Sequence, residues 1–406
     1  MRKSRLSEAG ENLFQRIKRK TAEAEKAGRK IIKLSIGQPS GPAFLEARTA
    51  AATAVLSEDE FMHEYQDNGS PGVPDFARRF VQTHVKIDLS QRKELSFLPI
   101  PGIKPMIPLI PFACGAKESF GLQVATTTDP GYPTPKDWCA GYLGQLLYHH
   151  SLKLGPANNF RFFPDDLFQI SKDIGSGDFK AKLVMMNYPH NPSGQVAIME
   201  WLLLLCHFCE RHDIRIWNDA AYAGLASSAS HCTLTDVACE FPELSWAEAF
   251  SGSKLGNCTG WRVGAMVGSS DFIADVARIK GNTDSGFAAP MAAGLLRLVE
   301  NHFDLIESLS SEYNSRLDCF INILTNCRMR LACKPGAGFF SLWHAPRMAF
   351  GEAVKNAEHF NSLMIERVGI VGVDFNPYIR YSVAQNDIVS VADEIRVAFE
   401  TAAVAY

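Results

Sequence analysis

The sequence predicts an α/β protein made of a large domain, in which a mostly parallel sheet is flanked by helices, and a smaller α+β domain. The first reason is that short apolar runs alternate with helical stretches from about residue 70 to 270, which is typical of a parallel sheet covered by helices. The apolar runs are 124–128, 183–187, 214–218, 246–250 and 263–267. The second reason is the different pattern after residue 290, where long helices come before a single short strand.

The elements follow one another in a simple order. Residues 1–30 predict a charged helix that forms an N-terminal arm, and the segment IIKLSIG predicts a short strand ending at Gly37. Residues 290–324 predict one or two long helices, followed by a Gly/Pro stretch, another helix, a short strand at 378–383 and a last helix. We therefore expect an N-terminal arm with part of the small domain in 1–45, the large domain in 46–289 and the small C-terminal domain in 290–406.

Composition limits the classes of function. The 406 residues carry 41 Lys and Arg against 44 Asp and Glu, a net charge of −3. This balance excludes the basic surface of a nucleic-acid-binding protein and provides no attraction to anionic membranes. The apolar fraction of 46% is enough for a large core. The longest apolar run, 201–209, is about half the length that a membrane-spanning helix needs.

The ten cysteines are scattered without a disulfide framework, which predicts reduced thiols in a cytoplasmic protein. Cys206 and Cys209 form one C-x-x-C pair, but a zinc site needs four ligands and no second pair is obvious. We therefore expect an ordinary amphipathic helix there and no metal site. The N-terminus is charged and contains no apolar segment of the kind found in secretory leaders.

Unusual polar residues follow several of the predicted strands. In open α/β sheets, chemistry collects at the carboxyl ends of the strands. The residues in these positions are Tyr132 in DPGYP, Asn191 in YPHNPSG, Asp219 and Tyr222 in DAAY, Ser251 and Lys254 in SGSK, and Arg262 in GWRVG. We expect these side chains to meet at one edge of the sheet.

Lys254 is the first candidate for catalysis. Enclosure by the core disfavours the charged form of a lysine and makes its amine available for a Schiff base with a carbonyl. The carbonyl of pyridoxal 5'-phosphate is the obvious partner, and this cofactor needs a carboxylate at its pyridine nitrogen. Asp219 is placed to provide that carboxylate.

The remaining groups match the other needs of the same cofactor. Asn191 and Tyr222 can donate hydrogen bonds to its ring oxygen. Its phosphate needs backbone amides, hydroxyls and a forked cation, which Ser251 and Arg262 can contribute. Tyr132 can offer an aromatic face to the ring.

At these residues the chain resembles a known family. The motifs HNPSG, DAAY and SGSK followed by GWRVG resemble, in order and spacing, those of the class I and II aminotransferases, which are aspartate-aminotransferase-like enzymes of fold type I. The resemblance implies pyridoxal-phosphate-dependent transamination between an L-amino acid and a 2-oxo acid. The reaction would be ping-pong, with the resting cofactor held as a Schiff base on Lys254 that then moves the substrate proton.

The resemblance implies further site residues. Gly37 would meet the substrate carboxylate through its backbone, and Arg380 in YIRYSVA would hold that carboxylate bidentately. Ile103 and Lys104 occupy the place of the family's phosphate cradle. Tyr65 would reach the cofactor phosphate of the neighbouring subunit, which implies a homodimer with shared active sites.

The chain also departs from the family pattern. Ile103 replaces the usual serine, and the segment 115–118 (GAKE) offers a rival place for the cradle. Gly102 is preferred because it lies 27 residues before Asp129 (129 − 102), which leaves room for a helix and a strand, whereas Gly115 lies 14 before it (129 − 115). The prolines after Gly102 should kink or break that helix. Before Arg380 the family's P-G-x-x-F-G loop is replaced by the shorter GIVGVDFNP.

Other functions remain open at this level. The same cofactor contacts also serve a carbon–sulfur β-lyase or an α-synthase, since the side-chain pocket selects the reaction. A cofactor-binding regulator without turnover, and an interaction protein without any ligand, are the alternatives from other classes.

Overall fold

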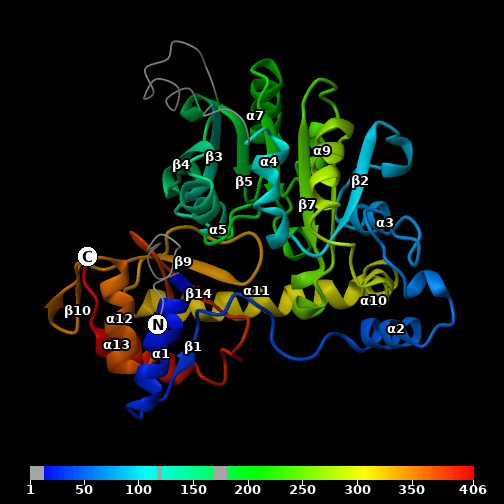
Figure 1. Ribbon diagram of the computed structural model, residues 1–406. Coiled ribbons are helices and arrows are strands. Elements are labelled where there is room, and N and C mark those ends of the chain that lie inside the picture. Colours follow the sequence, from blue (N-terminus) through cyan, green and yellow to red (C-terminus); the bar gives the residue numbers. More distant parts are fainter. Residues whose placement is uncertain (1–12, 117–120, 168–180) are drawn as a thin grey trace, which may run out of the picture. The chain divides into compact units, whose positions relative to one another are not determined.

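The computed structural model describes residues 13–116, 121–167 and 181–406 (Figure 1). The chain divides into two compact units. Unit 1 comprises Met1–Gly37, Tyr313–Lys334 and Phe339–Tyr406, and unit 2 comprises Gln38–Glu312 and Pro335–Gly338. The division into an arm (1–45), a large domain (46–289) and a small C-terminal domain (290–406) stays a prediction.

Unit 2 is built on a seven-stranded sheet in the order β2-β8-β7-β6-β5-β3-β4. Strands β3 to β7 run parallel, and β8 is antiparallel to its neighbours β2 and β7. The predicted mostly parallel sheet is therefore confirmed. The strands are β2 (Leu95–Ile100), β3 (Leu122–Asp129), β4 (Leu147–Lys153), β5 (Ala181–Met186), β6 (Arg215–Asp219), β7 (Trp246–Ser251) and β8 (Gly264–Ser269).

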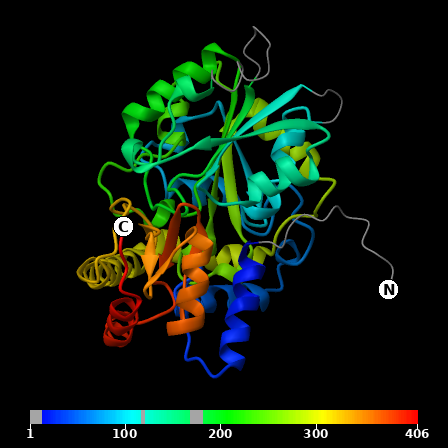
Figure 2. The same cartoon turned by 90° about the vertical axis from the view of Figure 1, so that its left-hand side faces the viewer.

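Helices cover both faces of this sheet (Figure 2). Helices α4 and α9 share one apolar cluster with the strands, in which Ile110 and Phe272 pack with Trp217. Helix α7 covers the other face with the buried side chains of Leu202 and Leu205. The helices are α2 (Leu45–Val55), α3 (Phe76–Gln82), α4 (Leu109–Ala113), α5 (Thr134–Lys136), α7 (Met199–Arg211), α8 (Thr235–Ala238), α9 (Ser270–Lys280), α10 (Ala289–Asn301) and α11 (Phe303–Asn326), whose second half belongs to unit 1.

The proline-rich segment after Gly102 is broken, as predicted. It forms one short turn of 3₁₀ helix (Lys104–Met106) and then the five-residue helix α4. Pro105, Pro108 and Pro111 cannot donate the backbone hydrogen bonds of a continuous helix. The chain after β2 therefore remains tightly curled instead of extending into one long helix.

Unit 1 contains an antiparallel sheet in the order β13-β14-β9, with β14 in the centre. The segment that looked like a shortened loop before Arg380 forms a tight hairpin, in which Val373 pairs with Arg380 and Phe375 with Tyr378. The elements are β1 (Ile32–Lys33), β9 (Phe340–His344), β10 (Met348–Ala349), β11 (Glu352–Ala353), β12 (Ile370–Val371), β13 (Val373–Phe375), β14 (Tyr378–Ser382), α1 (Leu13–Lys26), α12 (Ala357–Val368) and α13 (Ala392–Ala402).

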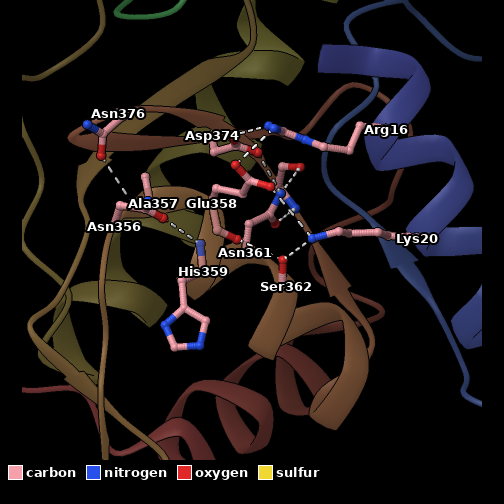
Figure 3. Close-up of polar contacts among 11 residues, drawn as sticks. Arg16, Lys20, Asn356, Ala357, Glu358, His359, Asn361, Ser362, Asp374 and Asn376 are labelled. Atoms are coloured by element: carbon pink, nitrogen blue, oxygen red, sulfur yellow. Dashed lines mark hydrogen bonds and ion pairs between the residues drawn. The ribbon is translucent and has the colours of Figure 1, made fainter. Parts of the chain in front are cut away.

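Helix α1 is tied to this hairpin by apolar and charged contacts. Its buried face packs Ile17 against Val373 and Phe375 of β13. Arg16 donates to Asp374 at 2.6 Å and pairs with Glu358 of α12 at 2.9 Å (Figure 3). The N-terminal arm therefore braces the strand next to the one that carries Arg380.

Some strands differ from the prediction. The strand expected to end at Gly37 is only Ile32–Lys33, because just these two residues pair with β12. Strands β2, β4 and β9 were not expected. β4 has the sequence LYHHSLK, and its alternating polar residues fit an edge strand with a solvated side.

In the part of the chain that the structure describes, no helix combines the length and the apolar character needed to cross a membrane.

Candidate active site

The polar residues singled out in unit 2 do gather at one edge of its sheet. β6 ends at Asp219 and β7 ends at Ser251, with Lys254 three residues later. The register pairs Asp219 with Ala249, so these two strands end almost level. Because parallel strands present their carboxyl ends on the same side, the segments after β3, β5, β6 and β7 meet there.

Asp219 and Lys254 lie within electrostatic reach of each other. Asp219 is only 7% exposed, and burial raises the pKa of its carboxyl to about 7. The backbone N–H of Ala221, which donates to Asp219 Oδ1 at 3.1 Å, and the positive charge of Lys254 both lower that pKa. A buried carboxylate in this state favours a second cation beside it.

Two tyrosines border this pair. The Nζ of Lys254 lies 5.8 Å from the ring centroid of the buried Tyr222. Tyr132 is partly buried, and burial, with the nearby charge of Asp219, raises the pKa of its hydroxyl. A hydrogen bond with Thr134 and the charge of Arg262 lower that pKa. Tyr132 therefore lies close to both Asp219 and Arg262.

The guanidinium of Arg262 lies against Gly102, and this pair is suited to be an anion cradle. Gly102 has a φ of +80°, a left-handed conformation that favours glycine, and a Cβ added there would lie 2.4 Å from Nη2 of Arg262. Backbone amides beside a guanidinium suit a phosphate. The rival glycine, Gly115, has no atom within 4 Å of its Cβ position. The contact with Arg262 supports the preferred placement at Gly102, while residues 117 and 118 of the rival motif lie outside the described residues.

Of the two side chains that follow Gly102, one is buried in the core and the other is exposed to solvent. Ile103 is 5% exposed and packs in the apolar cluster, so only its backbone faces a possible anion. Lys104 is exposed. The serine that the family usually has at this position is thus replaced by a core residue.

The SGSK turn contains a hydroxyl that sequence reasoning had not assigned. Ser251 is buried, and its Oγ accepts from the N–H of Ser253 at 3.1 Å. The Oγ of Ser253 in turn accepts from Nη1 of Arg262 at 3.1 Å. Ser253 therefore links the lysine turn to the anion cradle, and its place in S-x-S-K was the available signal.

Asn191 is 6% exposed, and its backbone N–H donates to Oδ1 of Asn187 at 3.0 Å. Asn187 was not singled out from the sequence, although it lies in the same strand-end segment. The neighbouring His190 is 1% exposed with a pKa lowered to about 3 by burial, and its Nδ1 lies 2.7 Å from Ser193 Oγ. Such a histidine is suited to a structural role in the loop.

Gly37 and Arg380 come together in unit 1. The guanidinium of Arg380 lies 4.1 Å from the ring of Phe340 and 5.5 Å from that of Phe375, and its Nη2 donates to the carbonyl of Ser35 at 2.9 Å. A Cβ on Gly37 would lie 3.7 Å from Nη2 of Arg380. Arg380 is only 1% exposed, so the aromatic rings hold its guanidinium in one orientation.

Tyr65 belongs to unit 2 and is 78% exposed. The structure therefore does not bring it into the buried group around Lys254. Its exposure leaves the hydroxyl available to another molecule.

The residues of this edge fit pyridoxal phosphate. The cofactor requires an amine, a carboxylate for a cationic ring and an anion cradle, and the edge contains Lys254, the buried Asp219 and the Gly102–Arg262 pair. The close approach of the Arg262 guanidinium to Gly102, whose φ is +80°, is the specific observation behind this fit. Among the described residues, no group of three or more His, Cys, Asp or Glu side chains is arranged to hold a metal ion.

Comparison with known proteins identifies the family. The family model for aminotransferase class I and II matches residues 29–389. This chain belongs to the class I and II aminotransferases. Its cofactor is pyridoxal phosphate and its reaction is transamination, so a β-lyase or an α-synthase is not favoured.

Relatives and solved structures agree with this membership. The chain is 30% identical over 374 residues to an LL-diaminopimelate aminotransferase of Halothermothrix orenii, which covers 90% of this chain and 88% of the relative. It is 28% identical over 381 residues to an enzyme of the same name from Moorella thermoacetica, covering 93% and 90%. An aspartate aminotransferase structure from Rhizobium meliloti superposes with a TM-score of 0.81 at 18% identity, covering 99% of this chain and 98% of that one, which shows the shared fold.

Proposed function

We propose that this aminotransferase moves an amino group between an L-amino acid and a 2-oxo acid with Lys254 and Asp219 as its central pair. The observation that carries the proposal is their proximity, because the charge of Lys254 lowers the pKa of a carboxyl that burial has raised to about 7. A lysine and a buried carboxylate at the end of neighbouring strands form an unusual pair. They suit a cofactor that needs both an amine and an anion.

Bound pyridoxal phosphate supplies an aldehyde that links to amines and a ring that takes up electrons. Lys254 would hold the aldehyde end, and Asp219 would face the ring nitrogen. Arg262, Ser251, Lys104 and the backbone of Gly102 and Ile103 would bind the phosphate. Tyr222 and Asn191 would donate to the ring oxygen, and Tyr132 would cover one face of the ring.

The protein's own groups then divide the work. Lys254 Nζ would take the proton from the substrate Cα as a base and later return it as an acid. Asp219 stays anionic beside a positive charge, which offsets the energetic cost of its burial. Arg380 binds the substrate α-carboxylate bidentately beside the backbone of Gly37, which orients the Cα–H bond. Repeating these steps with a 2-oxo acid gives ping-pong kinetics.

A homodimer with shared active sites is part of the proposal. An apolar hollow of about 480 Å³ in unit 2 is lined by residues of α2 together with Trp261 and Met291. Leu56, at the end of α2, is 82% exposed, and Tyr65 follows on the same stretch of chain. An exposed apolar surface of this kind suits a second copy, which would let Tyr65 reach the partner's cofactor phosphate. All ten cysteines are free, which supports the proposed cytoplasmic location.

We propose LL-diaminopimelate as the first amino donor to test, since the curated relatives carry that name. The experiment is a screen of L-amino acids against the loaded enzyme, followed by the change in cofactor absorbance. Each productive donor should shift the spectrum without a 2-oxo acid, and a 2-oxo acid should reverse the shift. Ammonia or thiol release instead of reversible exchange would contradict transamination. Exchange with other donors but not with LL-diaminopimelate would remove only the donor assignment.

A further inference from the structure

Three buried side chains that the family motifs do not include connect the ends of β5, β6 and β7. They are Asn187, which follows β5, Asn218 in β6 and Glu248 in β7. Their exposed fractions are 6%, 1% and 0%, respectively. A buried polar group is stable only with its hydrogen bonds made, so their partners show what each group holds in place.

Asn187 ties together two of the proposed cofactor residues. Its Nδ2 donates to the carbonyl of Asp219 at 2.8 Å, and its Oδ1 accepts from the N–H of Asn191 at 3.0 Å. The carbonyl needs a donor and the N–H needs an acceptor, so only this orientation of the carboxamide satisfies both. The backbone N–H of Asn187 is itself bound to Thr127 Oγ1 at 3.1 Å.

Asn218 and Glu248 hold the loop after β5, which contains Tyr188 and Asn191. Asn218 accepts from the N–H of Tyr188 and donates to its carbonyl, both at 2.9 Å. Its Nδ2 also donates to Glu248 Oε1 at 2.7 Å. Tyr188 is therefore fixed through both of its backbone groups, three residues before Asn191.

Glu248 is the anchor of this chain of contacts. Besides Asn218, its carboxylate accepts from the N–H of Leu234 at 3.1 Å and from the N–H and Oγ1 of Thr235, both at 2.7 Å. Burial raises its pKa to about 7, and the four donors lower it. All four contacts point donors at the carboxylate, which suits a group that accepts only.

We propose that Asn187 is a positioning residue that fixes the position of Asp219 relative to Asn191. Asn218 and Glu248 hold the loop after β5, which contains Asn191. This inference rests on the proposed cofactor roles of Asp219 and Asn191. Asp219 ends β6 and Asn191 lies in the loop after β5, so the carboxamide of Asn187 joins backbone groups of two separate segments. Without it, Asp219 would stabilise the cationic ring less well, and Asn191 would meet the ring oxygen less often.

The test compares Asn187→Ala with a matched control in unit 1. Asn361 is 2% exposed and also bridges backbone groups, donating to the carbonyl of Gly372 and accepting from its N–H, both at 3.0 Å. Asn361→Ala thus removes the same kind of contact in the unit that does not contain Asp219. The readouts are the dissociation constant of pyridoxal phosphate and the pH midpoint of the bound cofactor's absorbance change.

Asn187→Ala should weaken cofactor binding by about tenfold, the effect expected for losing hydrogen bonds that orient charged groups. Its pH midpoint should rise by about half a unit or more, since a less cationic ring makes the proton of the Lys254 link harder to lose. Asn361→Ala should change the dissociation constant less than about twofold. Asn187→Asp keeps the shape and the acceptor for Asn191, and it serves as the test if the alanine variant does not fold.

A folded Asn187 variant with the wild-type dissociation constant and midpoint would overturn the inference. Equal weakening by Asn361→Ala would also overturn it, because the effect would then be general destabilisation. The proposed function fails separately, if the wild-type enzyme does not link the cofactor to Lys254.

Discussion

Lys254 in unit 2 and Arg380 in unit 1, the two cations with roles in the proposed function, have different surroundings. Lys254 is partly buried at a strand end, next to the carboxyl of Asp219 and the ring of Tyr222. Arg380 is 1% exposed, in the centre of a three-stranded sheet, with two phenylalanine rings against its guanidinium. A partly buried position in a polar turn suits a group that exchanges partners and carries a proton. A group that only binds substrate benefits from aromatic rings that restrict the orientation of its guanidinium.

The largest effect should come from Lys254→Ala. The variant loses both the amine that holds the cofactor and the proton carrier, so kcat should fall by about 10³-fold or more. Steady-state assays of amino exchange measure it. The control is Lys182→Ala, which removes an exposed lysine paired with Asp213 at the opposite end of the sheet. Amino exchange by Lys254→Ala at the same rate as the control would contradict the proposed role of Lys254.

Arg380→Ala tests the binding side. Loss of a bidentate, charge-assisted contact should raise the KM for amino acids by about 10²-fold, with a smaller change in kcat. Arg380→Lys should restore only part of this, because a point charge cannot bind a carboxylate bidentately. Arg367→Ala, which removes an exposed arginine of α12 in the same unit, is the control. A folded Arg380→Ala enzyme with unchanged KM would show that another group holds the carboxylate.

In unit 2, we expect His84 to contribute to the pH dependence of stability. Its ring packs against Phe250 at the end of β7, and burial lowers its pKa from 6.5 to about 4. The folded state therefore keeps His84 neutral, and stability is lost as pH falls from 6.5 towards 4, where the unfolded chain takes up a proton first. Between pH 7 and pH 5 this contributes about 1–2 kcal/mol.

His84→Asn should remove that share of the pH dependence. Urea unfolding of the cofactor-free protein at the two pH values measures it. The raised pKa values of Asp219 and Glu248 make stability rise as pH falls, opposite to the effect of His84. Their contribution is the same in wild type and variant, so it cancels in the difference between them. An unchanged pH dependence in the variant would mean that His84 is not kept neutral by burial.

Arg16→Ala should give the smallest effect, on the brace of unit 1. It removes the contacts of Arg16 with Asp374 and Glu358, which are partly buried, so the free energy of unfolding should fall by about 1 kcal/mol. Arg19→Ala on the same helix breaks an exposed pair with Glu23 and should change the free energy of unfolding by less than about 0.5 kcal/mol. Equal effects of the two variants, measured by urea unfolding, would mean that α1 does not brace the hairpin.

The same contrast explains what could be predicted from the sequence. Motifs that are local and follow apolar strands made it possible to predict a common sheet edge for Asp219, Tyr222, Ser251, Lys254 and Arg262. Their chemical roles stay predictions until they are tested.

The missed features depend on contacts between distant segments. The carboxamide of Asn187 binds a backbone group of β6, and that of Asn218 binds backbone groups of the loop after β5, which no spacing in the sequence reveals. The hairpin β13–β14 looked like a truncated loop, because its pairing and its brace from α1 arise only when residues more than 300 positions apart meet (374 − 16 = 358).

The central claim is a covalent link between the cofactor and one nitrogen atom. Incubating the protein with pyridoxal phosphate, reducing it with borohydride and mapping the peptides by mass spectrometry tests this claim directly. We expect a single stable pyridoxyl group on Lys254 that disappears after prior exposure to a productive amino acid. Modification of a different lysine, or none at all in a protein that binds the cofactor, would contradict the account.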